Sequence, residues 1–190
     1  WVLSITKTHN GAVALTHNGK VVTAIQAERI SRTKRQSITL KDDKALVSNC
    51  VKYCLNQAGI THAEIQSIAI STSWDVTHVE DKVLFDYLGG TPNDFKGTYY
   101  VPHHFAHMEY IVHYSNLSPG IVLIVDGSGS KEKDRQQCNI LEEVSPECIS
   151  HVHMTGKETV SAYWFDGCRP VLIYRFSPPV AGFEKCNQNS

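Results

Sequence analysis

Two Asn-Gly dipeptides divide the start of the chain into three short apolar segments, and this pattern constrains the fold more than any other feature. The segments and the turns between them are residues 2–7, Asn10-Gly11, residues 12–15, Asn18-Gly19 and residues 21–27. Asn-Gly tolerates the positive φ angles that tight hairpin turns require. Three short strands joined by two such turns predict an antiparallel meander.

The residues after this meander alternate between helical and strand patterns. Apolar residues recur at roughly helical spacing up to Gln57, with Asp42 or Asp43 as the N-terminal cap and Gly59 just past the end. Pro102 suits a first helical turn, because its missing N–H would be unpaired there in any case. The other expected elements are a loop over 28–41, a strand over 65–71, a helix over 79–88, a loop over 91–100, a helix over 102–115 and a central strand over 121–125.

Three strands followed by helix, strand, two helices and strand is the order of the ribonuclease-H-like fold, an α/β fold with a mixed sheet. Actin-like ATPases contain two copies of it. A second copy would begin at Ile121 and add strands over 138–144, 160–165 and 171–176. We expect this copy to be incomplete, because the rest of the chain holds no convincing helix pattern. The expected domains are the first half of an actin-like domain, residues 1–120, and the start of the second, residues 121–190.

Two histidines at the start of the helix over 102–115 have the spacing of metal ligands. His103 and His107 are four residues apart, so both project from one helix face. Asp126 follows a buried strand, and ligands of α/β sheets gather at the carboxyl ends of strands. Two imidazoles and one carboxylate can hold a divalent cation, although two histidines do not choose between zinc and iron. The alternatives are surface histidines that bind nothing and an Asp-Gly that only forms a turn.

Each expected copy opens with a strand that leads into a small-residue hairpin, over residues 8–11 and 126–130. In such folds these hairpins present backbone N–H groups to phosphates. The candidates for substrate or nucleotide binding in these hairpins are Asn10, Gly11, Gly127, Ser128 and Gly129.

Four segments carry a family likeness: His9-Asn10-Gly11 and the residues that follow it, Ala27-Glu28-Arg29-Ile30-Ser31-Arg32-Thr33-Lys34, His103-His104-Phe105-Ala106-His107, and Asp126-Gly127-Ser128-Gly129. In order and rough spacing they resemble the carbamoyltransferase family that includes nodulation-factor and antibiotic O-carbamoyltransferases. The likeness covers about residues 1–130.

The resemblance implies a divalent metal, with iron favoured, held by His103, His107 and Asp126. It also implies that a C-terminal region of the same protein, beyond Ser190, makes carbamoyl-adenylate from carbamoyl phosphate and ATP. The actin-like domain would then transfer the carbamoyl group to a hydroxyl-bearing small-molecule acceptor. Taken alone, the 190-residue chain is expected to be inactive.

His9 matches the family's active-site histidine, which would hydrogen-bond the carbamoyl group or act as general base. Asn10 stands where the family usually has aspartate, so a charge-dependent role is in doubt there. Glu28, Arg29 and Arg32 match the second segment, and we expect them to contact the acceptor or a phosphate, or only to pin the loop by ion pairs.

Two other readings remain open. A tRNA threonylcarbamoyl-transfer protein would share the metal site, but it would usually lack the segment over 28–32, and a net charge of −1 disfavours a nucleic-acid partner. The chain could also be an inactive metal-binding fragment. No apolar stretch is long enough to span a membrane. Six cysteines without a compact framework favour free thiols and a cytoplasmic location.

Overall fold

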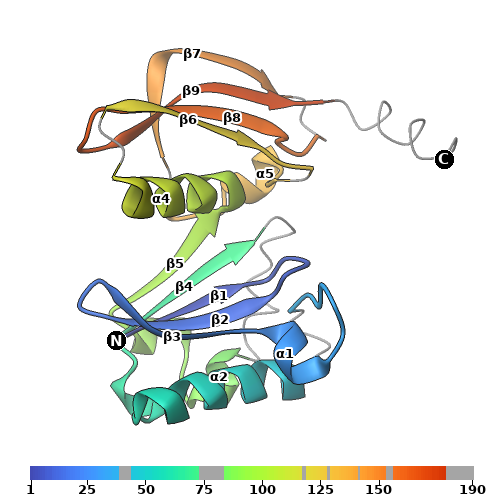
Figure 1. The fold of residues 1–190 in the computed structure, drawn as a ribbon, viewed down its shortest axis with the longest axis vertical. Helices are drawn as coiled ribbons and strands as arrows, with labels where there is room; N and C mark the ends of the chain where they lie inside the picture. The colour runs from blue at the N-terminus through green and yellow to red at the C-terminus, as the bar shows by residue number, and fades with distance from the viewer. Residues whose placement is uncertain are drawn as a thin grey trace, which may run out of the picture. The chain divides into compact units, whose positions relative to one another are not determined.

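The computed structural model describes residues 1–38, 44–72, 84–116, 119–127, 129–140, 142–152 and 156–178 (Figure 1). The chain forms two compact units, Trp1–Tyr100 and Val101–Ser190. The expected boundary after residue 120 would have placed the histidine helix with the first unit. In the structure this helix belongs to the second unit, together with the strands that follow it.

The first unit contains the predicted meander within a mixed five-stranded sheet. Its strands are β1 (Val2–Thr6), β2 (Ala12–His17), β3 (Lys20–Gln26), β4 (Ser67–Thr72) and β5 (Gly97–Pro102), in the order β3-β2-β1-β4-β5. β1 pairs antiparallel with β2 and parallel with β4, and β2 pairs antiparallel with β3. The antiparallel meander and the strand β4 agree with the ribonuclease-H-like half that the sequence predicts, whereas β5 was not expected.

Helix α2 (Lys44–Ala58) covers one face of this sheet, as Figure 1 shows. Alternate residues of β1 and β2 are buried, with Leu3, Ile5 and Val13 at most 1% exposed. Gly59 follows α2 with a φ of 66°, as expected for a helix stop. The proposed caps Asp42 and Asp43 lie outside the described residues. All five described cysteines are free thiols, in agreement with the sequence.

The two Asn-Gly turns form for different reasons. Asn18 and Gly19 have φ angles of 51° and 73°, the geometry predicted for both turns. Gly11 does not have a positive φ; instead a Cβ there would lie 2.6 Å from the backbone nitrogen of Ile38. The N–H of Gly11 donates to the carbonyl of Gln36, so the later segment packs directly on this turn.

Several expected elements were wrong in detail. Within the expected loop over 28–41, the short helix α1 (Ala27–Ser31) forms and ends at Arg32, which has a left-handed φ of 62°. The expected loop over 91–100 is instead the 3-10 turn η2 (Pro92–Asp94) followed by β5, because a Thr91–Asp94 capping box closes the turn and β-prone residues follow. Of the helix expected over 79–88, residues 84–88 are helical and the rest lie outside the described residues.

The second unit contains the start of the second copy. Its elements are α4 (His103–Ser115), β6 (Gly120–Val125), α5 (Glu132–Arg135), β7 (Glu143–Val152), β8 (Val160–Phe165) and β9 (Pro170–Ser177). The sheet order is β6-β8-β9-β7, with β7 parallel to β9 and the other pairs antiparallel. β6, β8 and β9 repeat the meander of β1, β2 and β3. The strand expected over 138–144 begins at Glu143 instead, because α5 and the turn after it occupy the preceding residues.

Helix α4 packs on one face of this second sheet (Figure 1). Phe105 and Met108 of α4 contact Val122 and Ile124 of β6 and Tyr163 of β8 in one buried cluster. The central strand expected over 121–125 was wrong in its position: among the described residues β6 pairs only with β8 and lies at the edge of the sheet, whereas β1 pairs on both sides. Alternate residues of β6, Ile121, Leu123 and Val125, are at least 60% exposed. Within the described part of the chain, no helix has the length and apolar character needed to cross a membrane.

Candidate metal centre

The first turn of α4 and the end of β6 bring the three predicted metal ligands together. Nε2 of His103 lies 2.8 Å from Oδ2 of Asp126 and 3.2 Å from Nε2 of His107. Nε2 of His107 lies 3.8 Å from the same carboxylate oxygen. The helical spacing brings the two rings to one face of α4, and β6, of which only Val122 and Ile124 are buried, leads directly into Asp126.

Hydrogen bonding accounts for this arrangement only if two acceptors share one N–H. A ring nitrogen of histidine is either a donor or an acceptor. If Nε2 of His103 donates to Asp126, Nε2 of His107 can only share the same N–H as a second acceptor over 3.2 Å. A shared cation would instead use a lone pair of each of the three atoms.

The spacing of the donor atoms fits a first-row divalent ion. Three atoms separated by 2.8, 3.2 and 3.8 Å lie on a circle with a radius of about 1.9 Å. An ion slightly off the plane of that circle would be about 2.0–2.2 Å from each donor, which is the usual range for zinc–nitrogen and zinc–oxygen bonds. The His103 side chain is 8% exposed and that of His107 is 50% exposed, so the centre opens to solvent on one side.

Two pKa shifts describe the charge at this centre. Burial alone would raise the pKa of Asp126, but the neighbouring His103 and its hydrogen bond lower it on balance. The carboxylate is therefore ionised at neutral pH. Burial, and then the proximity of His103, lowers the pKa of His104 to about 3, so this fully buried ring is neutral.

The two described glycines of the second hairpin, which follow Asp126, differ in burial. Gly127 is exposed, and a Cβ there would meet nothing within 4 Å. Gly129 is buried, and a Cβ there would lie 2.3 Å from Cγ of Glu158 and 2.7 Å from Nε2 of His104. Its N–H donates to the carbonyl of Glu158 and is therefore not available to a phosphate. The missing side chain of Gly129 instead lets the turn pack closely against Glu158 and His104. Ser128 lies outside the described residues.

The remaining predicted residues lie in the first unit. His9 and Asn10 are exposed at the tip of the first hairpin. Glu28 accepts a hydrogen bond from the backbone N–H of Arg35, and its other oxygen is 3.7 Å from Arg29. These contacts correspond to the loop-pinning alternative for Glu28. Arg32 is exposed at the end of α1.

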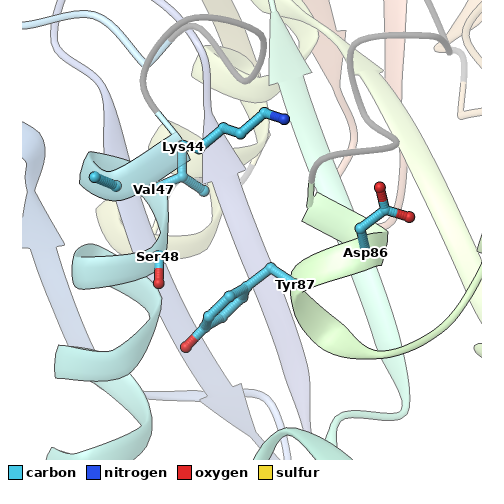
Figure 2. A pocket seen from close by; sticks show the side chains of 6 residues that line it. Lys44, Val47, Ser48, Asp86 and Tyr87 are labelled. Atoms are coloured by element: carbon cyan, nitrogen blue, oxygen red, sulfur yellow. The ribbon is translucent and has the colours of Figure 1, made fainter.

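Two open cavities lie in the first unit. One, of about 420 Å³, is lined by Lys44, Val47 and Ser48 of α2 and by Asp86 and Tyr87, which face them in Figure 2. The other, of about 510 Å³, includes Arg29 beside Tyr53. Neither cavity is lined by the three metal-ligand candidates.

The sequence motifs did not identify the residues that connect the histidines of α4 with the turn after Asp126. Ser130 Oγ accepts a hydrogen bond from the N–H of His103, and Glu158 Oε1 accepts from the N–H groups of Ser130 and His104. Glu158 lies far along the chain, and no motif surrounds it. Only the fold brings it to the site.

The fold and the site define this chain as an α/β protein with the ribonuclease-H-like, actin-like fold and a candidate centre of two histidines and one carboxylate. The solved structure of YeaZ from Pseudomonas aeruginosa has the same fold: it matches 94% of this chain and 67% of its own length, with a TM-score of 0.50. The two sequences are 10% identical, so this likeness concerns the fold alone.

The family model described as Carbamoyltransferase N-terminus matches residues 2–153. The chain therefore belongs to the carbamoyltransferase family. It is also similar to Nodulation protein NolNO of Sinorhizobium fredii (strain NBRC 101917 / NGR234), with 26% identity over 141 residues. That alignment covers 64% of this chain and 20% of NolNO, so the chain spans about a fifth of this relative.

Proposed function

We propose that this chain is the metal-binding N-terminal part of an O-carbamoyltransferase. A carbamoyl group would pass from carbamoyl-adenylate, made from carbamoyl phosphate and ATP, to the hydroxyl of a small-molecule acceptor. The observation that carries the proposal is the convergence of His103, His107 and Asp126, whose donor atoms lie within 4.8 Å of one another in a chain of this family.

In the proposed transfer, the acceptor oxygen forms a bond to the carbamoyl carbon, the bond from that carbon to the adenylate phosphate breaks, and AMP leaves. The acceptor's proton goes to a base, for which His9 is the proposed residue, because histidine is the side chain that most often acts as a general base. Its exposed position on the first hairpin leaves the ring accessible. Asn10 beside it is uncharged, so it would act by hydrogen bonding.

His103, His107 and Asp126 would hold the divalent cation, with iron favoured. When bound, such an ion supplies a Lewis acid for oxygen atoms of the carbamoyl or phosphate group. Asp126 is ready to bind at neutral pH without losing a proton, because its pKa is lowered. His104 adds no positive charge beside the ion, because burial keeps it neutral.

Calorimetry with a non-hydrolysable sulfamoyl analogue of carbamoyl-adenylate tests the proposal on the 190-residue chain loaded with Co²⁺. We expect binding by the loaded wild type and little or none by a His103→Ala, His107→Ala double variant. Absence of binding by the loaded wild type, or equal binding by both proteins, would contradict the proposal.

Catalysis by the isolated chain is a separate expectation. With carbamoyl phosphate, ATP, metal and hydroxyl acceptors present, we expect no carbamoylated product from the 190-residue chain, because the adenylate-forming region lies outside it. Product detected by mass spectrometry would overturn this expectation and leave the proposed metal centre intact.

A further inference from the structure

The N-terminus of α4 is capped from a distant part of the chain. The first N–H groups of a helix have no partner within the helix and need acceptors from elsewhere. Pro102, the N-cap residue, provides no side-chain hydrogen bond. The N–H of His103 instead donates to Oγ of Ser130 over 3.1 Å, and the N–H of His104 points to Oε1 of Glu158 over 3.5 Å.

The same carboxylate also holds the turn that follows Asp126. Oε1 of Glu158 accepts from the N–H of Ser130 over 3.2 Å, and the backbone of Glu158 exchanges two further hydrogen bonds with Gly129 and Ser130. One oxygen atom therefore contacts both segments that carry metal-ligand candidates: the start of α4, with the histidines, and the turn, with the aspartate.

Two arginines hold this carboxylate in place. Oε2 of Glu158 lies 3.6 Å from Arg135 and 3.5 Å from Arg175, and both guanidinium groups also pair with Glu142. Glu158 is 0% exposed and the two arginines are 6% exposed. A buried carboxylate with charged partners on one side and N–H donors on the other has little freedom to move.

We propose that Glu158 is a positioning residue for the metal centre: its carboxylate fixes the first turn of α4 against the turn after Asp126, and so sets the distance between the two histidines and the aspartate. This inference rests on the proposed metal centre. Replacing a residue that orients a metal ligand without binding the metal itself typically weakens metal affinity by roughly 10- to 100-fold.

Glu142 provides a matched control. It is buried and pairs with the same two arginines, and within the described ranges its ion pairs are with these arginines and not with α4 or the turn after Asp126. Titration of Co²⁺ into the 190-residue chain, followed by visible absorption, reports both affinity and coordination. We expect Glu158→Met to bind Co²⁺ roughly 10- to 100-fold more weakly with an altered spectrum, and Glu142→Met to bind like the wild type.

The conservative Glu158→Gln variant should recover most of the lost affinity, because an amide oxygen can accept from the same N–H groups. If Glu158→Met does not fold, Ser130→Ala takes its place, since it removes the acceptor for the N–H of His103. Wild-type affinity in a folded Glu158→Met or Ser130→Ala protein would overturn the inference and leave the metal centre standing. So would an equal loss in Glu142→Met. A wild type that binds no Co²⁺ would remove both proposals.

Discussion

Two glycines in the turn after Asp126 give opposite predictions for the same substitution. At Gly129 an added Cβ would lie 2.3 Å from Cγ of Glu158, 2.7 Å from Nε2 of His104 and 2.8 Å from the carbonyl oxygen of Glu158. The last atom is backbone, and both side chains are fully buried, so none of them can move away without cost. Overpacking of a buried site typically costs about 1–3 kcal/mol, and we expect Gly129→Ala to lose about 3 kcal/mol of unfolding free energy.

Gly127 is the matched control, because it lies in the same turn and a Cβ there meets nothing within 4 Å. Neither glycine has a positive φ, so backbone strain does not separate them. Gly127→Ala should therefore stay within about 0.5 kcal/mol of the wild type. Urea unfolding followed by circular dichroism measures both variants. Equal stability of the two alanine variants would show that the close packing of Gly129 against Glu158 and His104 is wrong.

Three further outcomes follow from burial and close contacts. Lowering the pH from 7 to 5 should reduce the unfolding free energy of the wild type by about 2 kcal/mol more than that of His104→Gln. The native His104 ring, with its pKa lowered to about 3, does not take up the proton that the unfolded chain binds below about pH 6.5. Urea unfolding at both pH values checks this, and an equal loss in the two proteins would refute it. Exposed Cys168 should react with a thiol reagent in the native protein while Cys54 does not, because burial raises the pKa of Cys54 to about 11, and peptide mapping by mass spectrometry distinguishes them. Gly11→Ala should lower the melting temperature by an amount that corresponds to about 1–3 kcal/mol, because its Cβ would lie 2.6 Å from the Ile38 backbone, and an unchanged temperature would contradict that contact.

The strands of the first meander were predictable because local chemistry determined them. The positive φ angles of Asn18 and Gly19 and the strand over the apolar run of β6 follow from neighbouring residues, and both matched the structure. The apolar run did not show that β6 lies at the edge of its sheet, because that depends on its pairing partners. The short helix α1 and the strand β5 were missed because neither segment shows a regular apolar period. β5 forms at the edge of the first sheet beside β4, and no periodic pattern in residues 91–100 signals that pairing.

At the candidate site, the residues with a regular spacing were predictable and their supports were not. His103 and His107 have helical spacing, and Asp126 marks the end of a strand, so the sequence indicated that they would meet. Ser130 and Glu158 have no comparable signal, because their role depends on where β6 and β8 bring the chain. The roles of His9, Asn10 and Arg32 stay predictions.

The metal content of the purified chain tests the account most directly. The 190-residue protein, its His103→Ala, His107→Ala double variant and a His113→Ala control from the exposed end of the same helix are each dialysed against the same divalent metal and analysed by mass spectrometry. The account predicts about one ion per chain in the wild type and the control, and almost none in the double variant, because loss of ligands removes tight binding. Equal metal content in all three proteins would contradict it.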